Sequence, residues 1–128
     1  MTTAATLMQV EFPRLSPTMP IRDAAAGLVA AGLSGAPVVD DTGAIVGMLT
    51  QKDCFRAALN ASYYRQWSGT VREAMGRGAL TLAADTELVA AAQAFLDHPH
   101  RLFPVTENGR LVGLLHRGDV LAALLAQG

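Results

Sequence analysis

The chain has 128 residues, which is enough for one domain with a buried core. Apolar residues make up 51% of it and charged residues only 16%, so we expect apolar surface that self-association would cover. The net charge of −1 gives no basic face for nucleic acid or for an acidic membrane, and neither partner is expected.

No targeting or membrane-spanning segment is predicted. Residues 1–10 lack the basic start and the sustained apolar stretch of a secretory signal. The longest uncharged run, residues 24–39, contains Ser34 and Pro37 and is shorter than the roughly 20 apolar residues that span a bilayer. We therefore expect a soluble, cytoplasmic protein.

The first half of the chain alternates between strand and helix signals. Its predicted elements are, in chain order, a strand over residues 8–12, a helix that Thr18 caps and Gly32 ends, strands over 36–39 and 44–49, and a helix over 52–59. Pro20 is compatible with the first helical turn, whose amides lack intrahelical partners. Residues 41–43 have turn chemistry, so the two strands are expected to form a hairpin.

The second half follows the same order. Its predicted elements are a strand over residues 79–82, a helix that Asp85 caps and Pro99 closes, strands over 102–106 and 111–115, and a helix over 117–126. Asn108 and Gly109 are a strong signal for a tight hairpin turn. Between the halves, Tyr63, Tyr64 and Trp67 form a cluster too apolar for a free linker, so we expect it to pack on a repeat or on a second subunit.

The two halves also repeat in sequence. The segment GMLTQKD at residues 47–53 returns as GLLHRGD at 113–119, and GAPVVD at 35–40 returns as LFPVTE at 102–107. This predicts two copies of one supersecondary unit, with residues 1–62 as the first repeat, 63–69 between the repeats and 70–128 as the second. A pocket between two copies is a natural ligand site.

The repeated pattern resembles the cystathionine-β-synthase (CBS) domain, and two copies in tandem resemble a CBS pair, or Bateman module. The quoted motifs and the segment VREAM at residues 71–75 carry the resemblance. It implies an α/β (α+β) fold of two β-α-β-β-α repeats packed about a pseudo-twofold axis. It also implies clefts between the repeats for an adenosine-containing ligand such as AMP, ADP, ATP or S-adenosylmethionine. The expected protein is a stand-alone regulatory module and a homodimer that signals through its dimer contacts or to an unidentified protein effector.

Thr50 and Asp53 carry the main functional hypothesis. A threonine followed three residues later by an acid is a helix-capping box, in which both side chains satisfy free amides. The same helix start would favour a ligand phosphate, and the carboxylate would accept the hydroxyls of a ribose. Residues alone favour the cap, and the resemblance favours Asp53 as a ribose ligand.

The second copy keeps Asp119 but has His116 at the threonine position. Histidine caps a helix less well than threonine, so His116 would either pair with a phosphate as an imidazolium or lie exposed. The specificity of this second cleft is therefore open, and it is a candidate for an empty cleft.

The resemblance adds residues that reach each cleft from the opposite repeat. The first cleft would then hold Thr50, Asp53, His100, Arg101 and Leu80, and the second would hold His116, Asp119, Leu33, Ser34, Gly35 and Pro13. The resemblance places the His100–Arg101 pair against phosphate, which a guanidinium can bind bidentately. The alternative is a solvated loop after Pro99. Residues near Pro13 and Leu80 are candidates for the walls of an adenine pocket.

No catalytic or metal site is predicted. His98 and His100 lack a third ligand at a recognisable spacing, and no nucleophile motif or phosphate-binding loop is present. The single cysteine, Cys54, excludes an intramolecular disulfide and is interpreted as a small buried hydrophobe, matching Val120 in the second repeat. We therefore expect no enzyme and no required cofactor, with the adenine nucleotide as a regulatory ligand. The rival hypothesis is a ligand-free structural module for dimerisation or protein interaction.

Overall fold

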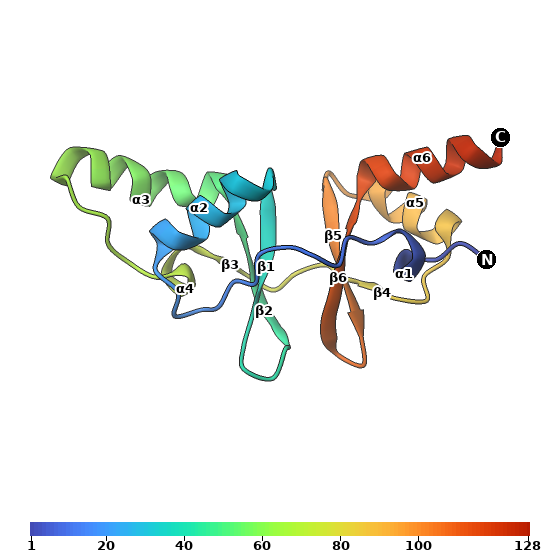
Figure 1. The fold of residues 1–128 in the computed structure, drawn as a ribbon, viewed down its shortest axis with the longest axis horizontal. Helices are drawn as coiled ribbons and strands as arrows, with labels where there is room; N and C mark the ends of the chain where they lie inside the picture. Colours follow the sequence, from blue (N-terminus) through green and yellow to red (C-terminus); the bar gives the residue numbers. More distant parts are fainter. The chain divides into compact units, whose positions relative to one another are not determined.

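The computed structural model describes all residues from Met1 to Gly128, which divide into two compact units (Figure 1). The first unit is Pro13–Ala79. The second unit combines Met1–Phe12 with Leu80–Gly128. The compact units therefore do not follow the order of the repeats, because the first twelve residues pack with the second repeat.

Each unit contains a three-stranded sheet and three helices, two of them long. The elements of the first unit are α2 (Ile21–Ala31), β1 (Gly35–Val39), β2 (Ile45–Thr50), α3 (Gln51–Tyr64), α4 (Val71–Ala74) and β3 (Gly76–Arg77). The elements of the second unit are α1 (Ala4–Leu7), β4 (Leu82–Ala83), α5 (Leu88–Asp97), β5 (Leu102–Glu107), β6 (Arg110–His116) and α6 (Arg117–Gln127). The predicted mixed α/β class is confirmed, with strand orders β1-β2-β3 and β4-β5-β6.

The two hairpins match in register, as the sequence repeat predicts. Gly35 faces Thr50 at the end of the β1–β2 pair, and Leu102 faces His116 at the end of the β5–β6 pair. Both pairs are antiparallel, and both contain one irregularity near the turn. Asn108 and Gly109 have φ angles of 54° and 76°, the left-handed conformation that a two-residue hairpin turn requires.

The turn of the first hairpin is built differently. The Asp40 carboxylate accepts hydrogen bonds from the hydroxyl and the backbone N–H of Thr42 at 2.6 Å and 2.8 Å, and from the N–H of Ala44. These bonds, led by the one from the Thr42 hydroxyl, lower the pKa of Asp40 below its ordinary value. The predicted turn over residues 41–43 is therefore held by an aspartate side chain.

The predicted leading strands need correction. No strand forms over residues 8–12; only Gln9 forms an isolated bridge, and its antiparallel partner is Leu114 in the second unit. In the matching place in the first unit, β3 pairs with Gly47 and Met48 of β2. The strand predicted over 79–82 is the short β4, which pairs in parallel with β5. The leading segment of each predicted repeat, with Gln9 in the first and Gly76–Arg77 in the second, thus pairs with a strand of the other repeat.

Two predicted helix starts are also wrong. Helix α2 begins after Pro20 rather than after Thr18, and α5 begins after Glu87 rather than after Asp85. Neither N-cap residue forms a side-chain hydrogen bond; the first helical N–H groups, those of Ile21 and Leu88, donate instead to remote backbone carbonyls. The predicted end of α2 is confirmed, because Gly32 adopts the left-handed conformation with φ 66°.

The core of each unit lies between its helices and one face of its sheet. Buried apolar residues of the first unit include Leu15, Ile21, Ala24, Leu28, Ala36, Val38, Leu49, Cys54 and Val71. Those of the second unit include Ala4, Leu88, Ala91, Val105, Leu115 and Val120. None of the helices is both long enough and apolar enough to cross a membrane.

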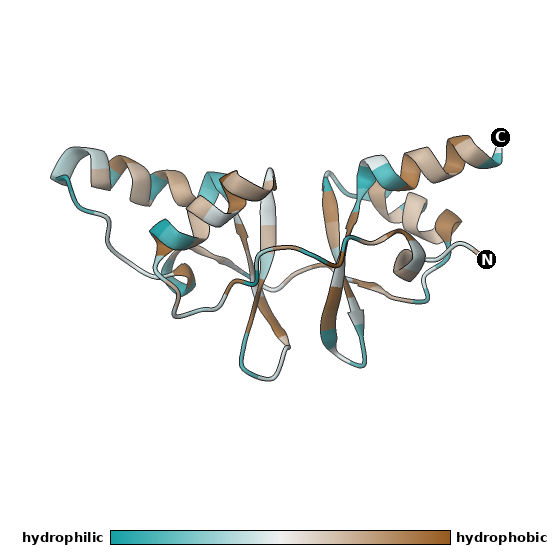
Figure 2. Ribbon diagram, viewed as in Figure 1, coloured by the Kyte–Doolittle hydropathy of each residue, from teal (hydrophilic) through white to brown (hydrophobic).

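Apolar side chains also remain on the outer faces of the helices. In the first unit they are Val29, Phe55 and Leu59, and in the second unit Val89, Leu96, Leu121 and Leu125, each at least 58% exposed. Figure 2 shows apolar bands along α6 up to its C-terminal part. The predicted surplus of apolar surface is therefore present in both units.

Candidate strand-to-helix sites

The candidate site residues lie where a strand runs directly into a helix. Strand β2 ends at Thr50 and α3 begins at Gln51; likewise, β6 ends at His116 and α6 begins at Arg117. We call these the first junction and the second junction. At such a junction the helix presents amides that lack intrahelical partners, and the aspartate of its first turn lies near them.

The first junction contains a complete capping box. The N–H of Asp53 donates to the hydroxyl of Thr50 at 3.1 Å, and the N–H of Thr50 donates to Oδ2 of Asp53 at 2.9 Å. Oδ1 of Asp53 accepts no hydrogen bond within the chain. The side chain is half-buried and lines a cavity of about 1170 Å³ along α3 and the segment around α4. The capping interpretation is therefore confirmed in this structure, and one carboxylate oxygen stays available.

The segment before β1 contacts the first junction. The carbonyl of Ser34 accepts from the N–H of Gln51 at 2.8 Å, and the carbonyl of Leu33 accepts from the amide side chain of Gln51, also at 2.8 Å. A Cβ on Gly35 would lie 3.1 Å from the Leu49 carbonyl and 3.2 Å from the Thr50 side chain, so glycine permits the close approach. Leu33, Ser34 and Gly35, predicted for the second cleft, thus lie beside Thr50 within the first unit.

The second junction has no cap. His116 occupies the N-cap position but forms no side-chain cap hydrogen bond. Its Nε2 instead forms a 2.6 Å hydrogen bond with Oε1 of Gln9. Asp119 is exposed and forms no hydrogen bond within the chain. No side chain therefore covers the first-turn amides at this helix start, and the Asp119 carboxylate is exposed.

His100 and Arg101 lie next to the second junction. The carbonyl of Arg101 accepts from the N–H of Arg117 at 2.9 Å, and the Arg101 side chain is exposed. The His100 ring stacks on Phe103 with centroids 5.2 Å apart, and its Nδ1 is buried without a hydrogen-bond partner. Of the pair, only Arg101 fits the solvated-loop alternative, because His100 is packed.

The predicted clefts draw on both units. Thr50 and Asp53 belong to the first unit, whereas His100, Arg101 and Leu80 belong to the second. Similarly, His116 and Asp119 belong to the second unit, whereas Leu33, Ser34, Gly35 and Pro13 belong to the first. Pro13 is half-buried, beside Gly27, and Leu80 is 48% exposed. The two cleft assignments stay predictions.

Two residues of the junctions, Gln51 and Gln9, were not predicted from the sequence. Gln51 ties the Leu33 carbonyl to the first junction, and Gln9 holds His116 at the second. A closer alignment of the repeats would have drawn attention to Gln9, because Met8-Gln9 aligns with Met75-Gly76. A glutamine at only one of two matching positions indicates a local difference between the sites.

Cys54 is a protonated, packed side chain. Its thiol donates to the carbonyl of Thr50 at 3.4 Å, and burial, followed by the nearby charge of Asp53, raises its pKa above the ordinary value of a thiol. A thiol with a raised pKa is a poor nucleophile. No group of three metal-binding side chains is present near the histidines or elsewhere.

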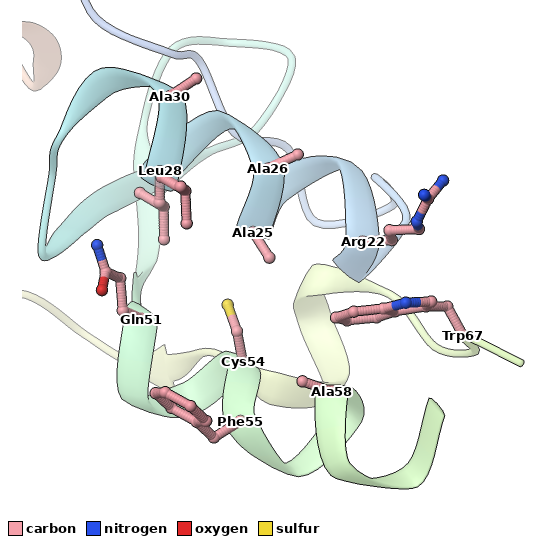
Figure 3. Close-up of a pocket in the computed structure, with 11 residues that line it drawn as sticks. Arg22, Ala25, Ala26, Leu28, Ala30, Gln51, Cys54, Phe55, Ala58 and Trp67 are labelled. Carbon is pink, nitrogen blue, oxygen red and sulfur yellow. The ribbon is translucent and has the colours of Figure 1, made fainter. Parts of the chain in front are cut away.

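An apolar pocket lies between α2 and α3 in the first unit (Figure 3). It has a volume of about 520 Å³, and its apolar lining consists of four alanines together with Leu28, Val29, Cys54, Phe55 and Trp67. Figure 3 shows Trp67 beside Arg22 at one end and Gln51 at the other. Trp67 therefore packs on its own unit, as predicted, whereas Tyr63 and Tyr64 are 81% and 72% exposed.

These features agree with the family comparison. The CBS domain family model matches residues 4–60 and 71–126, and the chain belongs to this family as a tandem pair. The CBS domain-containing protein YhcV of Bacillus subtilis is 27% identical over 113 residues, which cover 88% of this chain and 79% of the relative. An uncharacterized 17.7 kDa protein of Acidianus ambivalens is 29% identical over 112 residues, covering 87% of this chain and 66% of the relative.

The solved structure of CBSX2 from Arabidopsis thaliana has the same fold. Its complex with AMP superimposes with a TM-score of 0.83 at 27% identity, covering 99% of this chain and 98% of CBSX2. Three other relatives are longer proteins, and the match to this chain spans only 12–41% of their length. The tandem CBS pair is therefore established as the class of this chain.

Proposed function

We propose that this CBS pair is a non-catalytic regulatory module that binds an adenosine nucleotide of the AMP class. The observation that carries the proposal is the repeated junction, where a strand leads directly into a helix with Asp53 or Asp119 in its first turn. The AMP complex of CBSX2, a relative over nearly the whole chain, supports the choice of ligand. Adenosine triphosphate and S-adenosylmethionine are the alternative ligands within the same class.

The chemistry of each junction suits the parts of such a ligand. Unpaired helix amides and the helix dipole favour a phosphate. A carboxylate accepts two hydrogen bonds from neighbouring ribose hydroxyls, which a phosphate-binding cation cannot do. Asp53 offers its free Oδ1, and the exposed guanidinium of Arg101 is a candidate phosphate ligand. Leu80 and Pro13 are the candidate apolar contacts for adenine.

The proposed output is a population shift. A ligand that contacts residues of both repeats would favour one of their arrangements, and a second subunit or a protein effector would respond to it. The outer helix faces support a homodimer, because Phe55 is 61% exposed and also lines the pocket between α2 and α3. Charged substitution there, as in Phe55→Glu, should weaken self-association in sedimentation velocity.

The same pocket favours a second candidate function. An apolar pocket of about 520 Å³ beside exposed apolar helix residues suits a structural module whose purpose is dimerisation or partner docking. In that case the aspartates would only shape the helix starts. The two functions differ in one observable, the response of the folded protein to adenosine compounds.

A thermal-shift series tests the proposal. Wild type and the double variant Asp53→Asn/Asp119→Asn are heated with AMP, ADP, ATP, NADH or S-adenosylmethionine. Asparagine keeps an oxygen for the Thr50 amide, so the cap survives while the negative charge is lost. A ligand at about 100 times its dissociation constant should add about 2.7 kcal/mol, or several degrees. The absence of a shift with every compound would favour the structural module instead.

A further inference from the structure

The two junctions differ at two matching positions, whose side chains are in contact in the second unit. Thr50 of the first junction corresponds to His116 of the second. In the first unit the residue paired with Met48 of β2 is Gly76, which has no side chain. In the second unit the residue paired with Leu114 of β6 is Gln9, whose side chain contacts His116. A histidine and a glutamine therefore occur together where the other unit has a threonine and a glycine.

Gln9 is held on both its backbone and its side chain. Its backbone N–H and C=O exchange hydrogen bonds of 2.8 Å and 3.0 Å with Leu114. Its side-chain Nε2 donates to the carbonyl of Glu11 at 2.6 Å, which leaves Oε1 directed at His116. An amide oxygen accepts hydrogen bonds only, so Nε2 of His116 carries the proton. In the neutral ring, Nδ1 is then the unprotonated nitrogen.

This contact keeps His116 from covering the start of α6. At the first junction, Thr50 and Asp53 use a hydroxyl and a carboxylate oxygen to satisfy each other's amides. At the second junction the imidazole is bound to Gln9, and neither it nor Asp119 caps the helix. A ligand at the first junction would compete with these two side-chain hydrogen bonds, whereas no side chain of the second junction bonds to the amides of α6.

We propose that Gln9 is a positioning residue of the Asp119 site, an inference that rests on the proposed nucleotide-binding function. Gln9 fixes the Nε2-protonated form of His116 and holds the ring off the helix start. The first-turn amides of α6 beyond Arg117, which bonds to the Arg101 carbonyl, and the Asp119 carboxylate are thereby kept available to the phosphate and ribose of an adenosine nucleotide. The N-terminal segment that contains Gln9 thus determines the state of the ligand site in the second unit.

The ligand-free half of the proposal is tested by the proton position on His116. Protein with ¹⁵N-labelled histidine is measured by long-range ¹H–¹⁵N correlation at about pH 8. His116→Thr assigns the signal among the three histidines. Wild type should show the Nε2-protonated form, Gln9→Met should shift toward a mixture, and Gln9→Glu should retain it because the acceptor is kept. An Nδ1-protonated wild type, or no change in Gln9→Met, would overturn the assignment.

The ligand-bound half is tested by titrating AMP into variants with one junction disabled. In an Asp53→Asn background, Gln9→Met should weaken AMP binding about 2- to 10-fold, the net worth of one neutral hydrogen bond. In an Asp119→Asn background it should leave the affinity unchanged. Equal weakening in both backgrounds would reduce Gln9 to a fold-stabilising residue and contradict the proposal. If wild type binds no AMP, both the proposed function and the role of Gln9 in ligand binding are rejected. The histidine spectra still decide whether Gln9 positions His116.

Discussion

The first and second junctions share one backbone plan and use it differently. Both follow a hairpin of matching register, and both place an aspartate in the first helical turn. Yet Thr50 and Asp53 close the first helix start with reciprocal hydrogen bonds, whereas His116 turns to Gln9 and leaves Asp119 exposed. The two copies therefore keep one backbone frame for the candidate site, and only the first copy caps its helix with side chains.

The two units resemble each other most closely in their buried cores. Leu49 and Leu115 are matching residues, each completely buried. Replacing either with alanine should destabilise its unit by about 2–5 kcal/mol, because a cavity remains where the side chain was. Urea unfolding followed by circular dichroism would measure both. A cost below about 1 kcal/mol at only one of the positions would show that the cores are not equivalent.

Substitution of the matching glycines Gly47 and Gly113 should affect the stability of the two units differently. A Cβ on Gly47 would collide with the backbone carbonyl of Gly76, whereas a Cβ on Gly113 would collide only with the Met8 side chain. We expect Gly47→Ala to cost about 1–3 kcal/mol by disturbing the β2–β3 pair. Gly113→Ala should cost less, and Met8→Ala should relieve it. Equal costs in denaturant unfolding would contradict this account of the sheet edges.

The cap at the first junction should contribute a smaller amount. Thr50→Ala removes the hydroxyl that accepts from the Asp53 N–H and should cost about 1 kcal/mol of stability. The matched change His116→Thr offers the second helix a hydroxyl cap, so stability should stay equal or rise. Thermal unfolding without ligand is the measurement. A larger loss in His116→Thr than in Thr50→Ala would show that Gln9 and His116 stabilise their junction better than a cap does.

The smallest expected effect concerns pH and Cys54, whose counterpart in the second unit is Val120. Burial raises the pKa of Cys54 above its ordinary value in the folded chain, so in alkaline solution the unfolded chain loses the thiol proton more readily. Wild-type stability should therefore fall relative to Cys54→Val as the pH rises through the ordinary pKa of a thiol. Urea unfolding of both proteins at about pH 7 and about pH 10 would measure this. A pH-independent difference would mean that the folded thiol ionises normally.

Much of this fold could be predicted from local signals, and the reasons are visible in particular residues. Asn108 and Gly109 define their turn by left-handed backbone angles, and Gly32 ends its helix in the same way. The helix starts at Pro20 and Glu87 were missed because neither side chain forms a cap, so no local signal marks them. Residues 8–12 were predicted as a strand but form only the Gln9 bridge to Leu114, and an amphipathic segment does not specify which of two similar sheets it joins.

The candidate site was predictable only in part. The capping box of Thr50 and Asp53 follows from their spacing, and it is confirmed. The state of His116 was not predictable, because its partner Gln9 is remote in sequence and reaches it through the crossed packing of the first segment. Long-range pairing of polar side chains leaves no periodic signal in one sequence.

The most direct test of the whole account is calorimetric titration of AMP into wild type, Asp53→Asn and Asp119→Asn. Wild type should bind AMP at both junctions, and each variant should lose one of the two binding events while remaining folded. Binding that is unchanged in both variants, or absent from folded wild type, would contradict the assignment of the two junctions as nucleotide sites.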